Sequence, residues 1–106
     1  MNDAQDELLN RLKADPLLLG HARFYALVNQ YPKVAALWDW EQMIIRSSSF
    51  PSSLKVLSPE EVILLRFFEM IWNHQNKGFD LADAAGVLDK KERKMIADWF
   101  LEPFWP

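Results

Sequence analysis

The sequence contains no cysteine and only three glycines in 106 residues. Without cysteine, disulfides, thiolate zinc sites and thiol nucleophiles are excluded, so the fold has to be held by its apolar core alone. A chain without disulfides fits a reducing compartment, and we expect a cytoplasmic protein. The first residues, MNDAQDELL, are acidic and lack the basic stretch followed by an apolar stretch that marks a secretory signal.

Long apolar runs and an excess of basic charge are also lacking. No run approaches the roughly 18 to 20 apolar residues that a membrane-spanning helix needs, so we expect no contact with a membrane. The net charge is −3; residues 1–58 carry six basic and six acidic side chains, and residues 59–106 carry six and nine. Bulk charge therefore argues against non-specific nucleic-acid binding and leaves only a local basic patch as an option.

The chain is instead rich in apolar residues. Half of its residues are hydrophobic, and fourteen are Phe, Trp or Tyr, which is typical of a folded protein. The length indicates a single domain over residues 1–106. Apolar residues recur at helical spacing along most of the chain, so we expect an all-α fold, a compact bundle of five to six short helices packed around a central apolar helix at about residues 59–75.

The central helix has the clearest start signal in the sequence. The residues SPEE at 58–61 form a capping box, in which the serine and the second glutamate each accept a hydrogen bond from a backbone N–H group of the other. The apolar side chains that follow cover well over half of the helix circumference and leave a narrow polar stripe of Arg66, Glu69 and Asn73. We expect Gly78 to end this helix and Asp80 to cap the next.

Three helices are expected before it, over residues 3–13, 16–31 and 32–46, and the serine-rich loop 46–58 would then join two sub-bundles. His21 falls on the apolar face of the second helix, where an imidazole bonded to a backbone carbonyl is favoured over a ligand or general base. Glu41 falls within the apolar arc of the third helix, so either the arc reaches solvent there or the carboxylate meets a donor such as Arg23, Arg66, a histidine or a tryptophan N–H.

Two short helices are expected near the C-terminus, over 81–88 and 90–101, the second with a capping box at Asp89–Glu92. Its inner face would hold Met95, Ile96, Trp99 and Phe100. Its outer face would hold the basic residues Lys90, Lys91, Arg93 and Lys94.

Small residues in the first of these helices and a glycine near the turn are typical of a helix-turn-helix. This degenerate motif at 81–101 gives an alternative function, a DNA-binding regulator whose basic residues face phosphates. Glu92 departs from the motif, because an apolar residue is expected at its position. Ordinary packing at a helix corner is therefore favoured, and nucleic acid is the less favoured partner.

The last residues place two large aromatics, Phe104 and Trp105, between prolines at the end of the chain. Two interpretations stay open. The aromatics fold back onto the core, or they anchor a partner protein, because rigid aromatic side chains dominate many interfaces.

A short stretch carries a family resemblance. Trp72 and Asn73, followed by Gly78–Phe79–Asp80–Leu81, resemble a pattern in small bacterial domains of unknown function found among phage and mobile-element proteins. The resemblance covers about ten residues and leaves out the first 57. It implies a bacterial cytoplasmic protein and brings no assigned activity.

No catalytic motif is present: the sequence has no phosphate loop, no dinucleotide-binding turn and no His-Glu-x-x-His. His21, Glu41 and His74 are too scattered to indicate a site, so we expect no catalysis, no metal and no cofactor. We expect a small binding protein whose partner is another protein or a second copy of itself. The candidate partner-binding residues are Trp40, Arg66, Glu69, Asn73, Phe104 and Trp105.

Overall fold

The fold was analysed in a computed structural model, which describes residues 7, 10–11, 19–45 and 56–106. These residues form five helices and one two-stranded sheet. In chain order the elements are α2 (Leu19–Val28), α3 (Pro32–Ala35), β1 (Trp38–Asp39), β2 (Ile44–Ile45), α5 (Pro59–Asn73), α6 (Leu81–Val87) and α7 (Lys90–Leu101). The expectation of a mostly helical fold is confirmed. The helix expected over 3–13 and the loop 46–58 lie largely outside the described residues.

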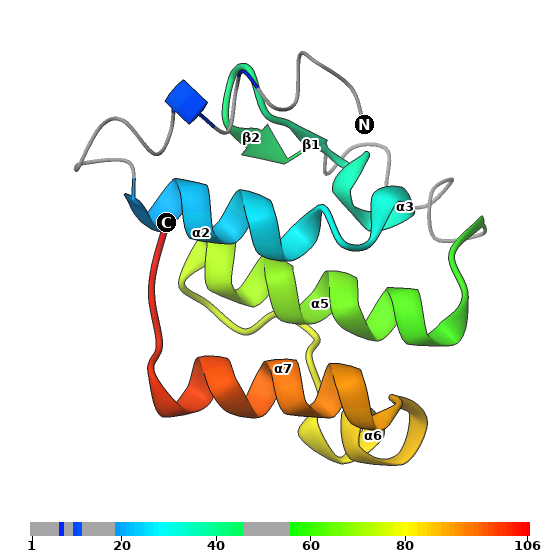
Figure 1. Ribbon diagram of the computed structural model, residues 1–106. Helices are drawn as coiled ribbons and strands as arrows, with labels where there is room; N and C mark the ends of the chain where they lie inside the picture. The colour runs from blue at the N-terminus through cyan, green and yellow to red at the C-terminus, as the bar shows by residue number, and fades with distance from the viewer. Residues whose placement is uncertain (1–6, 8–9, 12–18, 46–55) are drawn as a thin grey trace.

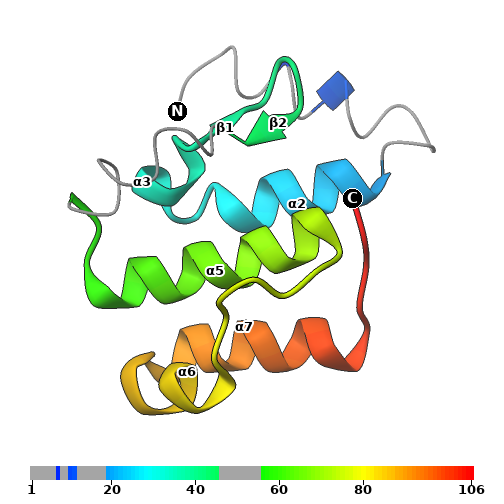
Figure 2. The same ribbon diagram turned by 180° about the vertical axis from the view of Figure 1, so that it is seen from behind.

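The three longest helices lie in successive levels, with α5 between α2 and α7 (Figure 1). The β1–β2 hairpin lies on the far side of α2 from α5, whereas α3 lies beside the end of α2 and contacts α5 (Figures 1 and 2). Helix α6 lies beside the first part of α7. The chain then returns from the end of α7 to the start of α2, where the C-terminus lies. The radius of gyration, 13.7 Å, is close to the roughly 13 Å of a compact domain of this length.

The sequence signal at the start of α5 is confirmed in detail. The backbone N–H of Glu61 donates to Ser58 Oγ at 3.2 Å, and the Ser58 N–H donates to Glu61 Oε1 at 2.9 Å, which completes the capping box. The helix ends earlier than expected, at Asn73, because His74 adopts a left-handed conformation with φ of 57°. Gly78 is therefore not the residue that ends α5.

The core is built mainly from α5 and the helices on either side of it. Leu65, Phe67 and Phe68 of α5 are almost completely buried. Phe24 of α2 packs edge-on against Phe68, with ring centroids 6.1 Å apart. Ile96 is the most buried residue of α7. None of the helices in the described ranges is long and apolar enough to cross a bilayer.

The expectation of a third helix over residues 32–46, and with it that of an all-α fold, is wrong in one place. Only Pro32–Ala35 is helical, and the chain then forms an antiparallel hairpin that pairs Trp38 with Ile45. Tryptophan and isoleucine favour strands. Asp39 favours a turn, and its Oδ1 accepts a hydrogen bond from the Gln42 N–H at 3.1 Å. These local preferences outweigh the helical spacing.

Candidate functional site

An exposed apolar surface lies between α6 and α7. Helix α6 begins at a capping aspartate, as expected, since Asp80 Oδ1 accepts from the Asp83 N–H at 2.9 Å. Leu81 follows directly and is 68% exposed. On α7, Phe100 is 74% and Leu101 77% exposed. Three large apolar side chains close together are therefore left in water, and exposed apolar patches of this kind often mark interaction sites.

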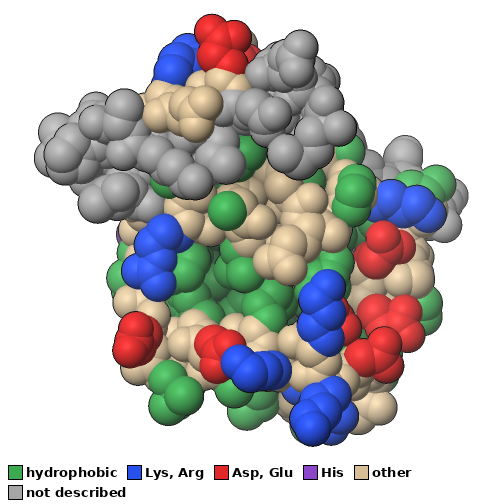
Figure 3. Space-filling view, in the orientation of Figure 1, with side chains coloured by type: hydrophobic (Ala, Val, Ile, Leu, Met, Phe, Trp, Pro, Cys, Tyr) green, Lys and Arg blue, Asp and Glu red, His purple; other side chains and the backbone are tan. Residues whose placement is uncertain are grey.

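These side chains surround a hollow of about 430 Å³, which we call the α6–α7 groove. Small alanines let the surface dip between the larger side chains, and one cation, Arg93, lies among them. The groove is lined by Leu81, Ala84, Ala85, Arg93, Ile96, Ala97, Phe100 and Leu101. Figure 3 shows hydrophobic side chains projecting along the lower edge of the molecule, below α7.

The sequence interpretation of α7 is wrong at Phe100. Met95, Ile96 and Trp99 pack on the core, but Phe100 points away from it. The reason is that α6 has only seven residues and accompanies only the first part of α7 (Figure 1). Nothing in the described chain extends far enough to cover the end of this face.

The basic side chains of α7 do not share one outer face. Lys91 and Lys94 line a second hollow on the α2 side of the helix, whereas Arg93 lies in the α6–α7 groove. Lys90 is exposed and lines neither hollow. A recognition helix would bring its cations to one surface. The observed division gives the helix-turn-helix interpretation no geometric support.

The capping box expected at the start of α7 is wrong. Asp89 makes no side-chain cap, and Glu92 turns away from the backbone to accept a hydrogen bond from the Tyr31 hydroxyl at 2.8 Å. Burial of the tyrosine, together with the hydrogen bond to Glu92 and its negative charge, raises the pKa of Tyr31 well above its usual value. This contact joins α7 to the residue that precedes α3.

The C-terminal tail packs on the protein itself. The Trp99 indole N–H donates to the Phe104 carbonyl at 3.0 Å, and the Arg23 guanidinium lies 4.3 Å from the centre of the Phe104 ring. Trp105 contacts Trp99 edge-on and His74, yet remains 49% exposed. Of the two interpretations of the tail, the structure therefore shows the first, although half of Trp105 is still accessible.

Trp40 belongs to the hairpin region, where it lies between β1 and β2. Its indole N–H donates to the Ala35 carbonyl at 3.2 Å, and its ring packs edge-on against Tyr25 and stacks on Trp38. It is partly buried and packed against the core. Trp40, Phe104 and Trp105 thus do not form a single aromatic patch.

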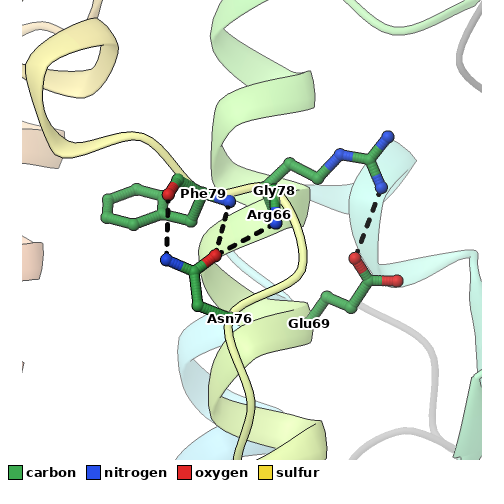
Figure 4. Close-up of polar contacts among 5 residues, drawn as sticks. All are labelled: Arg66, Glu69, Asn76, Gly78 and Phe79. Carbon is green, nitrogen blue, oxygen red and sulfur yellow. Dashed lines mark hydrogen bonds and ion pairs between the residues drawn. The ribbon is translucent and has the colours of Figure 1, made fainter.

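The polar stripe of α5 is partly covered. Arg66 and Glu69 form the expected ion pair at 3.3 Å, but the Glu69 side chain is only 10% exposed. The segment after α5 folds over the arginine, and a Cβ atom at Gly78 would lie 3.3 Å from Arg66 Cδ (Figure 4). The side chain of Asn76 holds this segment, because its Oδ1 accepts from the Gly78 and Phe79 N–H groups. Asn73 itself is exposed.

The remaining polar candidates are separate. Glu41 is exposed and pairs with Arg11 at 3.5 Å, because it lies in the hairpin turn and not in a helical arc. His21 contacts the Trp72 ring, and its Nδ1 atom has no hydrogen-bond partner in the part of the chain that the structure describes. The bond expected from this ring to a carbonyl is thus not seen at Nδ1. Among the described residues no group of three His, Cys, Asp or Glu side chains is placed to bind a metal ion.

No family model, curated protein or solved structure matches this chain. In the described part of the chain, the α6–α7 groove combines three large exposed apolar side chains with a hollow between them.

Proposed function

We propose that this chain is a small, non-catalytic interaction protein that associates with a second copy of itself through the α6–α7 groove. The observation that carries the proposal is the exposure of Leu81, Phe100 and Leu101 around a hollow floored by alanine. The bundle around α5 then serves as a rigid scaffold for this surface. The apolar residues that α5 presents to its neighbours are buried in the core and are not available to a partner.

A second copy is the occupant that the shape favours. In a twofold symmetric dimer the same surface has to supply both the projecting side chains and the hollow that receives them. The groove has both: Phe100 and Leu101 project, while Ala84 and Ala97 leave space beside them. The projecting side chains of each copy can therefore fill the hollow of the other copy.

The size of the surface fits a dimer of modest affinity. A standard interface removes about 800 Å² from each partner, which is about an eighth of the 6761 Å² of this protein's accessible surface. The exposed parts of Leu81, Phe100 and Leu101 supply roughly 400 Å² of apolar area for its centre. The polar residues at the margin of the groove have to supply the rest of the buried area.

Charge also favours an antiparallel arrangement of the two α7 helices. With the twofold axis beside Ala97, residues at equal distances from Ala97 face each other, so Arg93 of one copy lies opposite Leu101 of the other. Glu102 follows Leu101 and is exposed. It then offers a carboxylate to an arginine that has no ion pair within the described residues.

Sedimentation equilibrium tests the proposal. The wild-type protein should dimerise, and Phe100→Ser with Leu101→Ser should weaken the dimer at least about a hundredfold, because each residue contributes about 1.5 kcal/mol or more when buried. Val56→Ser is the matched control, since Val56 is 67% exposed and lies outside the groove. A wild type that stays monomeric at millimolar concentration, or a control that weakens the dimer equally, refutes the proposal.

Two charge variants test the arrangement and the DNA-binding alternative. Arg93→Glu should weaken the dimer, and adding Glu102→Arg should restore part of the loss. Exchanging Lys90, Lys91 and Lys94 for glutamine should leave dimerisation unchanged. A salt-sensitive retardation of duplex DNA that this triple variant abolishes would favour the helix-turn-helix regulator instead.

A further inference from the structure

A second hollow lies on the opposite side of α7 from the α6–α7 groove, between α7, α2 and the C-terminal tail. Its volume is about 380 Å³, at the lower end of the range of about 300 to 1,000 Å³ that is common for ligand sites. We call it the α2–α7 trough. Figure 3 shows it as a depression with a hydrophobic floor and with Lys and Arg side chains on its left, right and lower margins.

The floor of the trough is apolar and is held in place by the fold. Leu27 contributes from α2, Met95 and Trp99 from α7, and Phe104 from the tail. The Trp99 ring packs edge-on against Phe67 of α5, with centroids 5.6 Å apart, and its N–H is fixed to the tail. An aromatic or aliphatic group can therefore enter without much rearrangement of the floor.

The margin of the trough carries more unneutralised positive than negative charge. Arg23 is held over the Phe104 ring and makes no ion pair with any described residue, and the same is true of Lys91. Lys94 is neutralised by Asp98 at 2.7 Å. The trough therefore has two cations, one on α2 and one on α7, that lack a carboxylate partner.

Two acidic groups limit what the trough can accept. Asp98 and Glu102 also line it. Glu102 partly offsets the free cations and would repel a ligand with several negative charges. Tyr31 also lines the trough, but its hydroxyl group already donates a hydrogen bond to Glu92 and is not available to a ligand as a donor. A ligand with one anionic group and an apolar body thus fits better than a neutral molecule or a polyphosphate.

We propose that the α2–α7 trough binds small amphipathic carboxylates, with the apolar body on Trp99 and Phe104 and the carboxylate attracted by both Arg23 and Lys91. The two hollows share no lining residue, so the trough does not need self-association in order to form; Glu102 alone takes part in both proposals, because it lines the trough and is also proposed to pair with Arg93 of a second copy. The site also gives a role to the docked tail, since Phe104 forms part of the floor.

The probe is 4-phenylbutyrate, and its control is 4-phenylbutyramide, which has the same body without the charge. Titration followed by the backbone amide NMR shifts of the full chain should place phenylbutyrate between α2, α7 and the tail. The amide should bind at least about threefold more weakly, and added salt should narrow that difference. Equal binding of the two probes, shifts centred on α6, or no shift up to millimolar concentration would overturn the proposal.

Adjacent lysines supply matched variants. Lys91→Gln should weaken phenylbutyrate binding about twofold to fivefold and leave phenylbutyramide binding unchanged, whereas Lys90→Gln should affect neither, because Lys90 is exposed outside the trough. Identical behaviour of the two variants would overturn the assignment. The Phe100→Ser, Leu101→Ser protein should bind phenylbutyrate as the wild type does, so a failure of self-association leaves this test intact.

Discussion

Replacing Gly20 by alanine tests whether the tail is docked on α2. A Cβ atom at this position would collide with the carbonyl oxygen of Trp105 and would come within 3.2 Å of its carbonyl carbon and 3.3 Å of the Pro106 Cα. All three are backbone atoms, so no side chain can rotate away to make room. The tail has to leave its position for the alanine to be accommodated.

The expected cost follows from what the tail contacts. Displacing it removes the hydrogen bond from Trp99 to the Phe104 carbonyl, about 1 kcal/mol, and the burial of half of Trp105 and much of Phe104, roughly 5 kcal/mol as an upper limit. The freed residues regain about 1 kcal/mol each in backbone entropy, and alanine is better than glycine in a helix by about 1 kcal/mol. We expect Gly20→Ala to destabilise the fold by about 2 kcal/mol or less.

Urea denaturation, with the wild type and a chain lacking residues 103–106 as references, measures the effect. Without the tail there is no collision, so the same substitution should stabilise the truncated chain by up to about 1 kcal/mol. The sign of the effect thus reverses between the two backgrounds. Stabilisation in both backgrounds would refute the docking of the tail.

Two further predictions concern contacts that join elements. Ser58→Ala should lower the unfolding free energy by about 1 kcal/mol in urea denaturation, whereas Ser58→Thr should keep most of it; an unchanged alanine variant would contradict the capping box. Because the pKa of Tyr31 is raised in the fold, the unfolded chain loses this proton first, and stability falls as the pH rises above about 10. The fall should be shallower in Tyr31→Phe, and parallel curves from pH 8 to 11 would contradict the Tyr31–Glu92 contact.

The sequence predicts those parts of the fold that short-range chemistry decides. The capping box at Ser58, the cap at Asp80 and the helix start at Pro32 depend on a few neighbouring residues, and all three are found. Glu92 shows the limit of such patterns. It has the spacing for a capping box, but its carboxylate instead accepts a hydrogen bond from a tyrosine 61 residues earlier in the chain.

The candidate sites could be predicted only in part. Helical spacing places the arginine and lysines of α7 on one face, but their division between two hollows depends on which neighbours α7 has on each side. Helical spacing predicts Phe100 in the core, because the spacing cannot show that α6 is too short to cover this residue. The length of α6 relative to α7 decides whether Phe100 is covered, and the spacing of apolar residues does not give this length.

Intermolecular NOEs test whether two copies associate through the α6–α7 groove. In an equimolar mixture of isotope-labelled and unlabelled protein, isotope filtering retains only contacts between copies. We expect contacts from the Phe100 ring of one copy to the methyl groups of Ala84 and Ala97 of the other. Intermolecular contacts that involve other surfaces, or none at concentrations near 1 mM, where even a weak dimer is populated, would contradict self-association through the α6–α7 groove.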